Sequence, residues 1–147
     1  MPNKLAIVTG ASTGIGLELA KLAAEEGYDL IVASDTPQVD AGAAFKEQDA
    51  SVQSIEADLA TEQGVRQLLD VVGERQVDVL VANAGHGLGG PFLEQEPRDW
   101  THVIDTNVTG TLLLIQPVAR KMVERGEGKV LIVGSIAGHL AGSFQAV

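Results

Sequence analysis

The stretch KLAIVTGASTGIGLELAKLAAEEG, residues 4–27, decides the fold because it passes from a strand through a tight turn into a helix. Residues 4–10 are an apolar, β-branched run, and residues 15–27 repeat apolar side chains at helical spacing. The turn between them contains Gly10, Gly14 and Gly16. Glycines in such a turn let phosphate oxygens approach the free amides and the positive dipole end of the helix. The order of strand, glycine-rich turn and helix therefore predicts a pyrophosphate site at the start of an α/β fold.

The rest of the chain repeats this alternation of strand and helix. Strands are expected at 28–34, 51–59, 77–85 and 128–135, and helices at 38–48, 61–73 and 97–125. Because helices separate the strands, we expect right-handed crossovers and a parallel, doubly wound sheet. The strands are nearly continuous apolar runs, which is typical where both faces of a sheet are covered. One domain spanning 1–147 is predicted, with 86–96 as its one long internal loop.

The expected helix over 97–125 carries an apolar stripe and an internal proline. The stripe consists of Trp100, Val103, Ile104, Asn107, Thr111, Leu114, Val118 and Met122. Pro117 lies inside the helix, where a proline removes a hydrogen bond, so a local bend is expected there. In the preceding helix, Thr61 is the expected N-cap.

Composition narrows the class of function. The 10 Lys and Arg face 20 Asp and Glu, and this net charge of −10 disfavours a nucleic-acid surface because phosphate contacts require clustered cations. The cysteine-free sequence excludes disulfides and thiolate metal sites, and it favours a cytoplasmic location. Neither a signal peptide nor a membrane partner is expected, since no apolar run approaches the roughly 18–20 residues of a membrane span. His86, His102 and His139 lack metal-binding spacing, so no metal site is predicted.

Four motifs, each on the expected element, resemble those of the short-chain dehydrogenase/reductase family. They are TGASTGIG at 9–16, NAG at 83–85, NVTG at 107–110 and GS at 134–135. The resemblance covers essentially the whole chain. It implies a Rossmann-type doubly wound parallel sheet with five strands present and the C-terminal part of the family fold missing.

The resemblance also implies roles for individual residues. The cofactor-binding set is Gly10, Ser12, Thr13, Gly14, Ile15, Gly16, Asp58, Leu59, Asn83, Ala84 and Gly85, and the catalytic set is Ser135 and Asn107. Simpler roles stay open for four of these residues. Asp58 could cap a strand end, and Asn83 could hold neighbouring strands together through its side chain. Asn107 could be a polar residue at a helix bend, and Ser135 a turn residue.

Asp35 bears on the choice between NAD and NADP. It lies 19 residues after Gly16, where an acidic residue can bind the ribose 2′-hydroxyl and repel a 2′-phosphate. Residues 28–45 contain no lysine or arginine, and Thr13 stands where phosphate-preferring members of the family often carry a basic residue. A nicotinamide cofactor is expected, with NAD favoured over NADP. The alternative is that Asp35 is a solvated loop acid.

The family's chemistry is hydride transfer between a nicotinamide and an alcohol or carbonyl carbon, with a tyrosine of a Y-x-x-x-K pair as the proton donor. That tyrosine is expected one residue beyond Val147, and the one tyrosine of the sequence is Tyr28. We therefore expect the truncated cofactor-binding part of an NAD(P)-dependent oxidoreductase, inactive alone. Its substrate would be a small-molecule alcohol or carbonyl compound, and the complete protein would be a homo-oligomer. The alternative is a non-catalytic dinucleotide-binding or interaction fragment.

Overall fold

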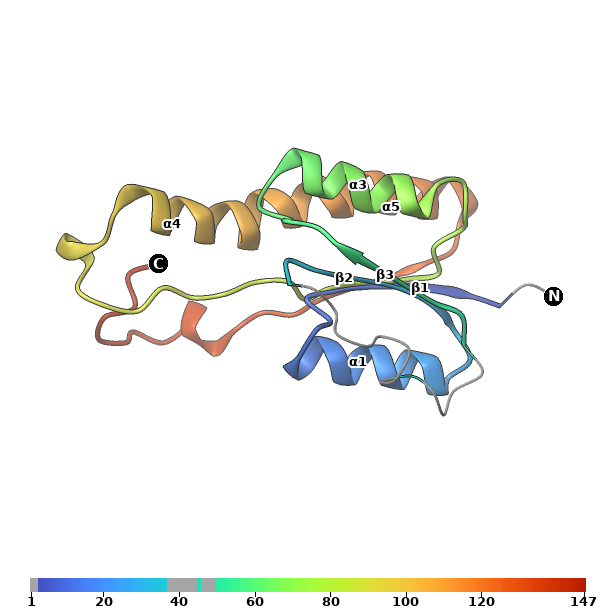
Figure 1. Cartoon of the computed structure of the whole chain (residues 1–147), viewed down its shortest axis with the longest axis horizontal. Helices are drawn as coiled ribbons and strands as arrows, with labels where there is room; N and C mark the ends of the chain where they lie inside the picture. The colour runs from blue at the N-terminus through green and yellow to red at the C-terminus, as the bar shows by residue number, and fades with distance from the viewer. Residues whose placement is uncertain (1–2, 37–44, 46–49) are drawn as a thin grey trace.

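The computed structural model of the chain describes residues 3–36, 45 and 50–147. Its centre is a parallel sheet of five strands in the order β3-β2-β1-β4-β5 (Figure 1). The strands are β1 (Leu5–Thr9), β2 (Asp29–Ser34), β3 (Val52–Glu56), β4 (Val79–Ala82) and β5 (Lys129–Ile132). The predicted doubly wound α/β fold is confirmed.

The order of the strands reverses at β1. From β1 the chain moves outward to β2 and β3, and it then returns to the other side of β1 to form β4 and β5. β1 and β4 are parallel neighbours, with Ile7 opposite Leu80. In doubly wound sheets, ligands bind beyond the carboxyl ends of the two strands at such a reversal. The candidate site is therefore expected just beyond Thr9 and Ala82.

Helices cover the two faces of the sheet. α1 (Gly14–Glu25) lies on one face, and α3 (Glu62–Val72) and α5 (Thr111–Arg125) lie on the other (Figure 1). α5 continues a long helix that begins as α4 (Pro97–Ile104) and passes through a π-helical segment, η2 (Asp105–Gly110). Two short 3-10 helices, η1 (Phe92–Glu94) and η3 (Ile136–Gly138), follow β4 and β5.

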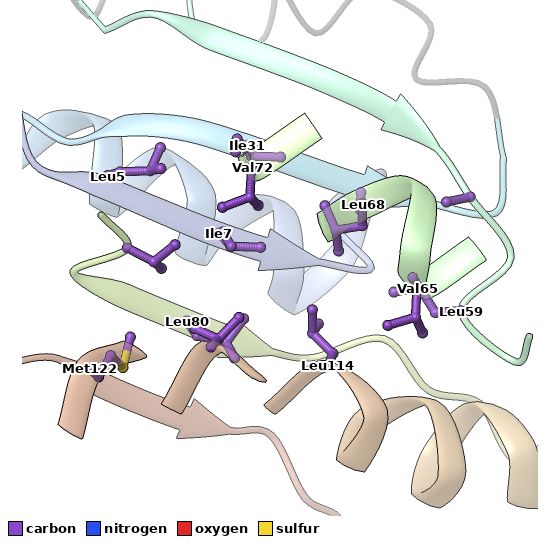
Figure 2. Close-up of a cluster of buried hydrophobic side chains, with 14 residues drawn as sticks. Leu5, Ile7, Ile31, Leu59, Val65, Leu68, Val72, Leu80, Leu114 and Met122 are labelled. Carbon is purple, nitrogen blue, oxygen red and sulfur yellow. The ribbon is translucent and has the colours of Figure 1, made fainter. Parts of the chain in front are cut away.

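Alternate residues of the central strand β1 pack into two separate hydrophobic cores. Leu5 and Ile7 pack toward α3 and α5, as Figure 2 shows, whereas Ala6 and Val8 pack toward α1. This division follows from the two-residue period of a strand. Beside β1, the first core contains Ile31, Leu59, Val65, Leu68, Val72, Leu80, Leu114 and Met122. The two cores fix α1 and α3 on opposite faces, and so fix the turns that precede each helix.

The strand β5 is an exposed edge strand of the sheet. All of its residues are exposed. β5 stands at the edge of the sheet and pairs with β4, with Ala82 opposite Ile132. An edge strand is buried only where other elements cover both its faces, and the described elements cover those of β5 incompletely. An exposed parallel edge is expected at the fifth strand where the covering C-terminal part of the family fold is missing, and this expectation is confirmed for β5.

The long helix keeps the predicted bounds of 97–125 but not a uniform geometry, and it continues through Pro117. Ile104 is 42% exposed, whereas Gly110 is buried. The π-helical segment explains this difference, because a π turn holds an extra residue and rotates its neighbours away from an α-helical stripe. The prediction that Ile104 faces the core is wrong. Other members of the stripe are buried as expected, namely Val103, Leu114, Val118 and Met122.

The helix expected over 38–48 falls outside the described residues except for Phe45, which is buried in the core beside α1. Within the described residues, no helix combines the length and apolar character that crossing a membrane requires.

Candidate functional site

The turn between β1 and α1 has the conformation that its glycines allow. Gly10 has φ +63° and Gly14 has φ +58°, both in the left-handed region that favours glycine. Thr13 is the N-cap of α1, yet its side chain makes no capping hydrogen bond. The first amides of α1 therefore have no capping side chain as acceptor, and they carry the positive end of the helix dipole. Such a helix start is a site for an anion.

Asn83 and Thr9 join the ends of β4 and β1 beside this turn. The Asn83 amide nitrogen Nδ2 donates to the carbonyl oxygens of Thr9 (3.0 Å) and Gly10 (3.2 Å). In the other direction, Thr9 Oγ1 accepts from the backbone amides of Asn83 and Ala84, each at 3.0 Å. Asn83 thus holds neighbouring strands together, as the simpler reading proposed, and it lies against the glycine turn at the same time.

The glycine turn and the end of β4 are in close contact. A Cβ atom at Gly16 would collide with the carbonyl oxygen of Gly10 and with Asn83 Nδ2. A Cβ at Gly10 would lie 2.9 Å from the Ala84 Cα. Only glycine permits this approach at either position. The result is a backbone-lined cradle at the point where the strand order reverses.

Asn107 fixes the turn that follows β4. Its Oδ1 accepts from the His86 amide (3.0 Å) and its Nδ2 donates to the His86 carbonyl oxygen (2.8 Å). A Cβ at the adjacent Gly85 would come within 2.9 Å of Asn107 Oδ1. Asn107 lies in the π-helical segment η2, and such segments occur frequently at functional sites. The structure thus brings Asn107 and Gly85 together.

Two residues of this arrangement escaped the sequence analysis. His86 accepts and donates through its backbone, which no sequence pattern reveals, and its ring lies 4.9 Å from the His102 ring between centroids. Thr9 belongs to the glycine motif, but its hydroxyl was given no role. The signal available in the sequence was a polar threonine at the end of an otherwise apolar strand.

Ser135 follows β5 and so lies beyond the carboxyl ends of the strands, as Asn83 does. It is exposed and is the N-cap of η3, and its Oγ accepts from the Ala137 amide at 3.1 Å. Ser135 therefore acts as a turn residue, the simpler of the two roles considered for it. Its hydroxyl hydrogen remains available to donate. Because Ala82 and Ile132 are opposite one another in β4 and β5, the segments leading to Asn83 and Ser135 leave the sheet side by side.

Three residues are expected at the adenosine end of the cofactor, namely Asp35, Asp58 and Leu59. Asp35 is exposed and directly follows the last residue of β2. Asp58 Oδ1 accepts from the Ala60 amide (3.0 Å), so Asp58 also shapes the turn into α3. The Leu59 side chain is buried in the core. Leu59 can therefore present only backbone atoms to a ligand.

The remaining cofactor residues lie around the start of α1. Ser12 is half-buried, whereas Thr13 and Ile15 are exposed. No group of three or more His, Asp or Glu side chains in residues 3–36, 45 and 50–147 is arranged to hold a metal ion.

Comparison with known proteins finds relatives over nearly the whole chain. A family model described as short chain dehydrogenase matches residues 4–147. The 3-oxoacyl-(acyl-carrier-protein) reductase of Staphylococcus epidermidis is 36% identical over 149 residues, which cover 98% of this chain and 61% of the reductase.

Solved structures share the fold. A candidate NAD(P)-dependent gluconate 5-dehydrogenase from Beutenbergia cavernae, with NADP bound at low occupancy, matches with a TM-score of 0.89 at 28% identity and covers 99% of this chain. An NAD⁺-bound xylitol dehydrogenase matches with a TM-score of 0.87 at 30% identity and covers 97% of this chain. The chain spans between 57% and 61% of the length of these three relatives.

Proposed function

The chain belongs to the short-chain dehydrogenase family, and from this premise we propose that its 147 residues form a single dinucleotide-binding domain of an NAD(P)-dependent oxidoreductase. The complete enzyme transfers a hydride between the nicotinamide and a small-molecule alcohol or carbonyl compound. Its cytoplasmic location and homo-oligomeric assembly stay predictions.

The observation that carries this proposal is the cradle at the reversal of the strand order. Gly10 and Gly16 allow backbone contacts that any Cβ would prevent, and α1 begins there without a capping side chain. A pyrophosphate fits this arrangement because it accepts hydrogen bonds from backbone amides and interacts favourably with the helix dipole. Gly14 lies at the open side of the turn, where a Cβ would meet nothing within 4 Å.

In the proposed reaction, the nicotinamide supplies or accepts the hydride. Ser135 orients the substrate oxygen, since its hydroxyl hydrogen is free to donate while Oγ accepts from Ala137. Asn107 positions the turn at His86 beside the reacting groups. Tyr28 cannot serve as the proton donor of the family, because it directly precedes β2 and so lies at the opposite end of the sheet from the cradle.

We propose NAD rather than NADP as the cofactor, on the basis of Asp35. The Asp35 carboxylate is exposed at the carboxyl end of β2, the neighbour of β1, where it can accept from the ribose 2′-hydroxyl and repel a 2′-phosphate. The competing function is a non-catalytic dinucleotide-binding or interaction fragment. It is favoured by the use of Ser135 Oγ as a cap.

Cofactor binding by Gly16→Ala tests the proposal. The added methyl group displaces Asn83 and the Gly10 carbonyl, so we expect the Kd for NAD to rise at least about 10-fold, a loss of roughly 1.4 kcal/mol. Gly87→Ala is the matched control, because a Cβ at Gly87 meets nothing within 4 Å. Titration calorimetry on the complete natural protein gives both constants, with NADP as a second ligand.

Unchanged NAD binding by Gly16→Ala would contradict the placement of the pyrophosphate, and tighter binding of NADP than of NAD would contradict the choice of cofactor. Cofactor-dependent turnover of alcohols or ketones favours the oxidoreductase. Cofactor binding without turnover by the complete protein favours the non-catalytic alternative.

A further inference from the structure

Two histidines from different elements bring their imidazole rings together beside the candidate site. His86 directly follows Gly85 in the turn after β4, and His102 lies in α4. Their ring centroids are 4.9 Å apart, and the ring planes are inclined by 40°. Both residues are exposed, so solvent and dissolved ions can reach them. We call His86 and His102 the histidine pair.

The backbone on each side of the histidine pair is held in place. Asn107 Oδ1 accepts from the His86 amide, and Asn107 Nδ2 donates to the His86 carbonyl oxygen. The His102 carbonyl oxygen accepts from Thr106 Oγ1 at 2.9 Å within the long helix. In the part of the chain that the structure describes, the hydrogen bonds of both histidines use backbone atoms. The ring nitrogens are therefore available to a ligand.

The separation of the two rings matches that of two imidazoles bound to one metal ion. The ion lies about 2.0–2.1 Å from an imidazole nitrogen, and so about 3.2 Å from the centre of the ring. Bond angles of about 90–110°, from square-planar to tetrahedral coordination, then place the two ring centres about 4.5–5.2 Å apart. The observed 4.9 Å falls within this range. A chelate is therefore compatible with the two backbone positions as they stand.

The charges near the histidine pair favour a dication. Asp99 and Asp105 each lie three residues from His102 along the long helix, and residues at this spacing are neighbours on a helix surface. Arg98 lies one turn before His102 and pairs with Asp99 at 3.4 Å. Two carboxylates and one guanidinium leave a negative local charge, in a chain whose net charge is −10. Such a field attracts cations.

We propose that the histidine pair binds a divalent transition-metal ion, with His86 and His102 as its two protein ligands and solvent in the remaining positions. Imidazole suits Zn²⁺, Cu²⁺ and Ni²⁺, whereas Mg²⁺ and Ca²⁺ prefer oxygen ligands. A site with two protein ligands is consistent with the lack of a larger His, Asp or Glu cluster in the described residues. Sequence spacing does not reveal this site, because its ligands belong to different elements.

The bound ion joins the turn after β4 to α4, and so restrains the turn that begins at Gly85. The Asn107 contacts already hold the backbone of this turn, and the ion adds a second restraint through the side chain of His86. The inference does not rest on the proposed oxidoreductase function, because its tests require no nicotinamide.

Titration calorimetry of the complete natural protein with Zn²⁺ tests the site. We expect His86→Gln and His102→Gln each to raise the Kd for Zn²⁺ at least about 10-fold, since either change destroys the chelate. The double variant should bind about as weakly as the single variants, because the first substitution already removes the shared interaction. His139→Gln is the matched control, since His139 is an exposed histidine at the end of η3, and it should leave the Kd unchanged.

Three results of this titration overturn the inference. They are the absence of Zn²⁺ binding by the unsubstituted protein, equal effects of His139→Gln and His102→Gln, and losses that simply add in the double variant. Additive losses would mean that the two imidazoles act independently and only pack against one another. Mg²⁺ in place of Zn²⁺ tests the carboxylates. Equal binding of Mg²⁺ would assign the ion to Asp99 and Asp105, and would also overturn the inference.

Hydrogen exchange of the His86 amide gives a second measurement that does not depend on activity. This amide donates to Asn107 Oδ1, so its exchange requires the turn to open. We expect Zn²⁺ to slow the exchange at least about 10-fold, because opening then also requires release of the ion. In His102→Gln, which retains the Asn107 contacts, Zn²⁺ should leave the rate unchanged. Slowing that persists in His102→Gln, or no slowing in the unsubstituted protein, overturns the inference.

Discussion

Asn83 and Asn107 both use a side-chain amide to continue backbone pairing where the regular structure has ended. Asn83 donates to two successive carbonyl oxygens beyond β1, and Asn107 pairs with both the amide and the carbonyl of His86. An amide side chain suits both positions because it carries a donor and an acceptor. Aspartate would lack the donor and would place a negative charge against the carbonyl oxygens. The same contacts of Asn83 and Asn107 therefore support the fold and shape the candidate site.

Asn83→Ala tests the structural part of this role. The substitution leaves the Thr9 and Gly10 carbonyl oxygens without their side-chain donor, so we expect the free energy of unfolding to fall by about 1–3 kcal/mol. Asn3→Ala is the matched control, since Asn3 bonds to Asp29 at an exposed position and its loss should change stability by no more than about 0.5 kcal/mol. Urea denaturation followed by circular dichroism measures both. Equal small effects would show that the Asn83 contacts contribute nothing net.

The helices α1 and α3 begin in contrasting ways. Thr61 caps α3, because its Oγ1 accepts from the Gly64 amide at 3.0 Å and donates to the Asp58 carbonyl oxygen at 2.8 Å. Thr13 occupies the same position before α1 and makes no such bond. Both threonines have extended backbone conformations, so the difference lies in the side chains. An uncapped start is what a helix needs if a ligand is to satisfy its amides.

Threonine-to-alanine substitutions at the two helix starts should therefore differ. Thr61→Ala removes the capping bond to Gly64, and we expect it to lower the free energy of unfolding by about 0.5–2 kcal/mol. Thr13→Ala removes no cap and should change it by no more than about 0.5 kcal/mol. Thermal denaturation of the two variants without cofactor decides the matter. A loss at Thr13 as large as that at Thr61 would mean that α1 is capped by its own side chain after all.

Periodicity and turn chemistry account for most of what could be predicted at the scale of elements. The alternation of apolar runs and helical stripes predicted a parallel sheet with helical crossovers. The glycines predicted the turn at 9–16. The π-helical segment could not be predicted, since it depends on packing around Gly110, where a Cβ would collide with the Leu59 carbonyl oxygen. The clamp of Asn107 on His86 was hidden for a related reason, because it joins a side chain to backbone atoms 21 residues away.

At the scale of the whole molecule, β5 and α5 both carry exposed apolar side chains. Val130, Leu131 and Ile132 are exposed on the edge strand, and Leu112 and Val123 are exposed on α5. The outer edge of β5 presents backbone groups to which another strand could add, and exposed edges of this kind promote association between chains. The net charge of −10 opposes association through mutual repulsion, but this repulsion is screened by salt.

The 147-residue chain should therefore associate with itself through β5, and more strongly as salt is added. Leu131→Lys introduces an edge lysine, the device by which natural sheets avoid edge-to-edge pairing, and we expect it to shift the chain toward monomer. Leu22→Lys is the control, because it adds the same charge at an exposed leucine on α1, away from the edge strand. Sedimentation velocity at low and high salt measures the distribution of species. A monomeric unsubstituted chain, or equal effects of the two lysines, would show that the exposed surface of β5 does not drive association and that general charge is sufficient.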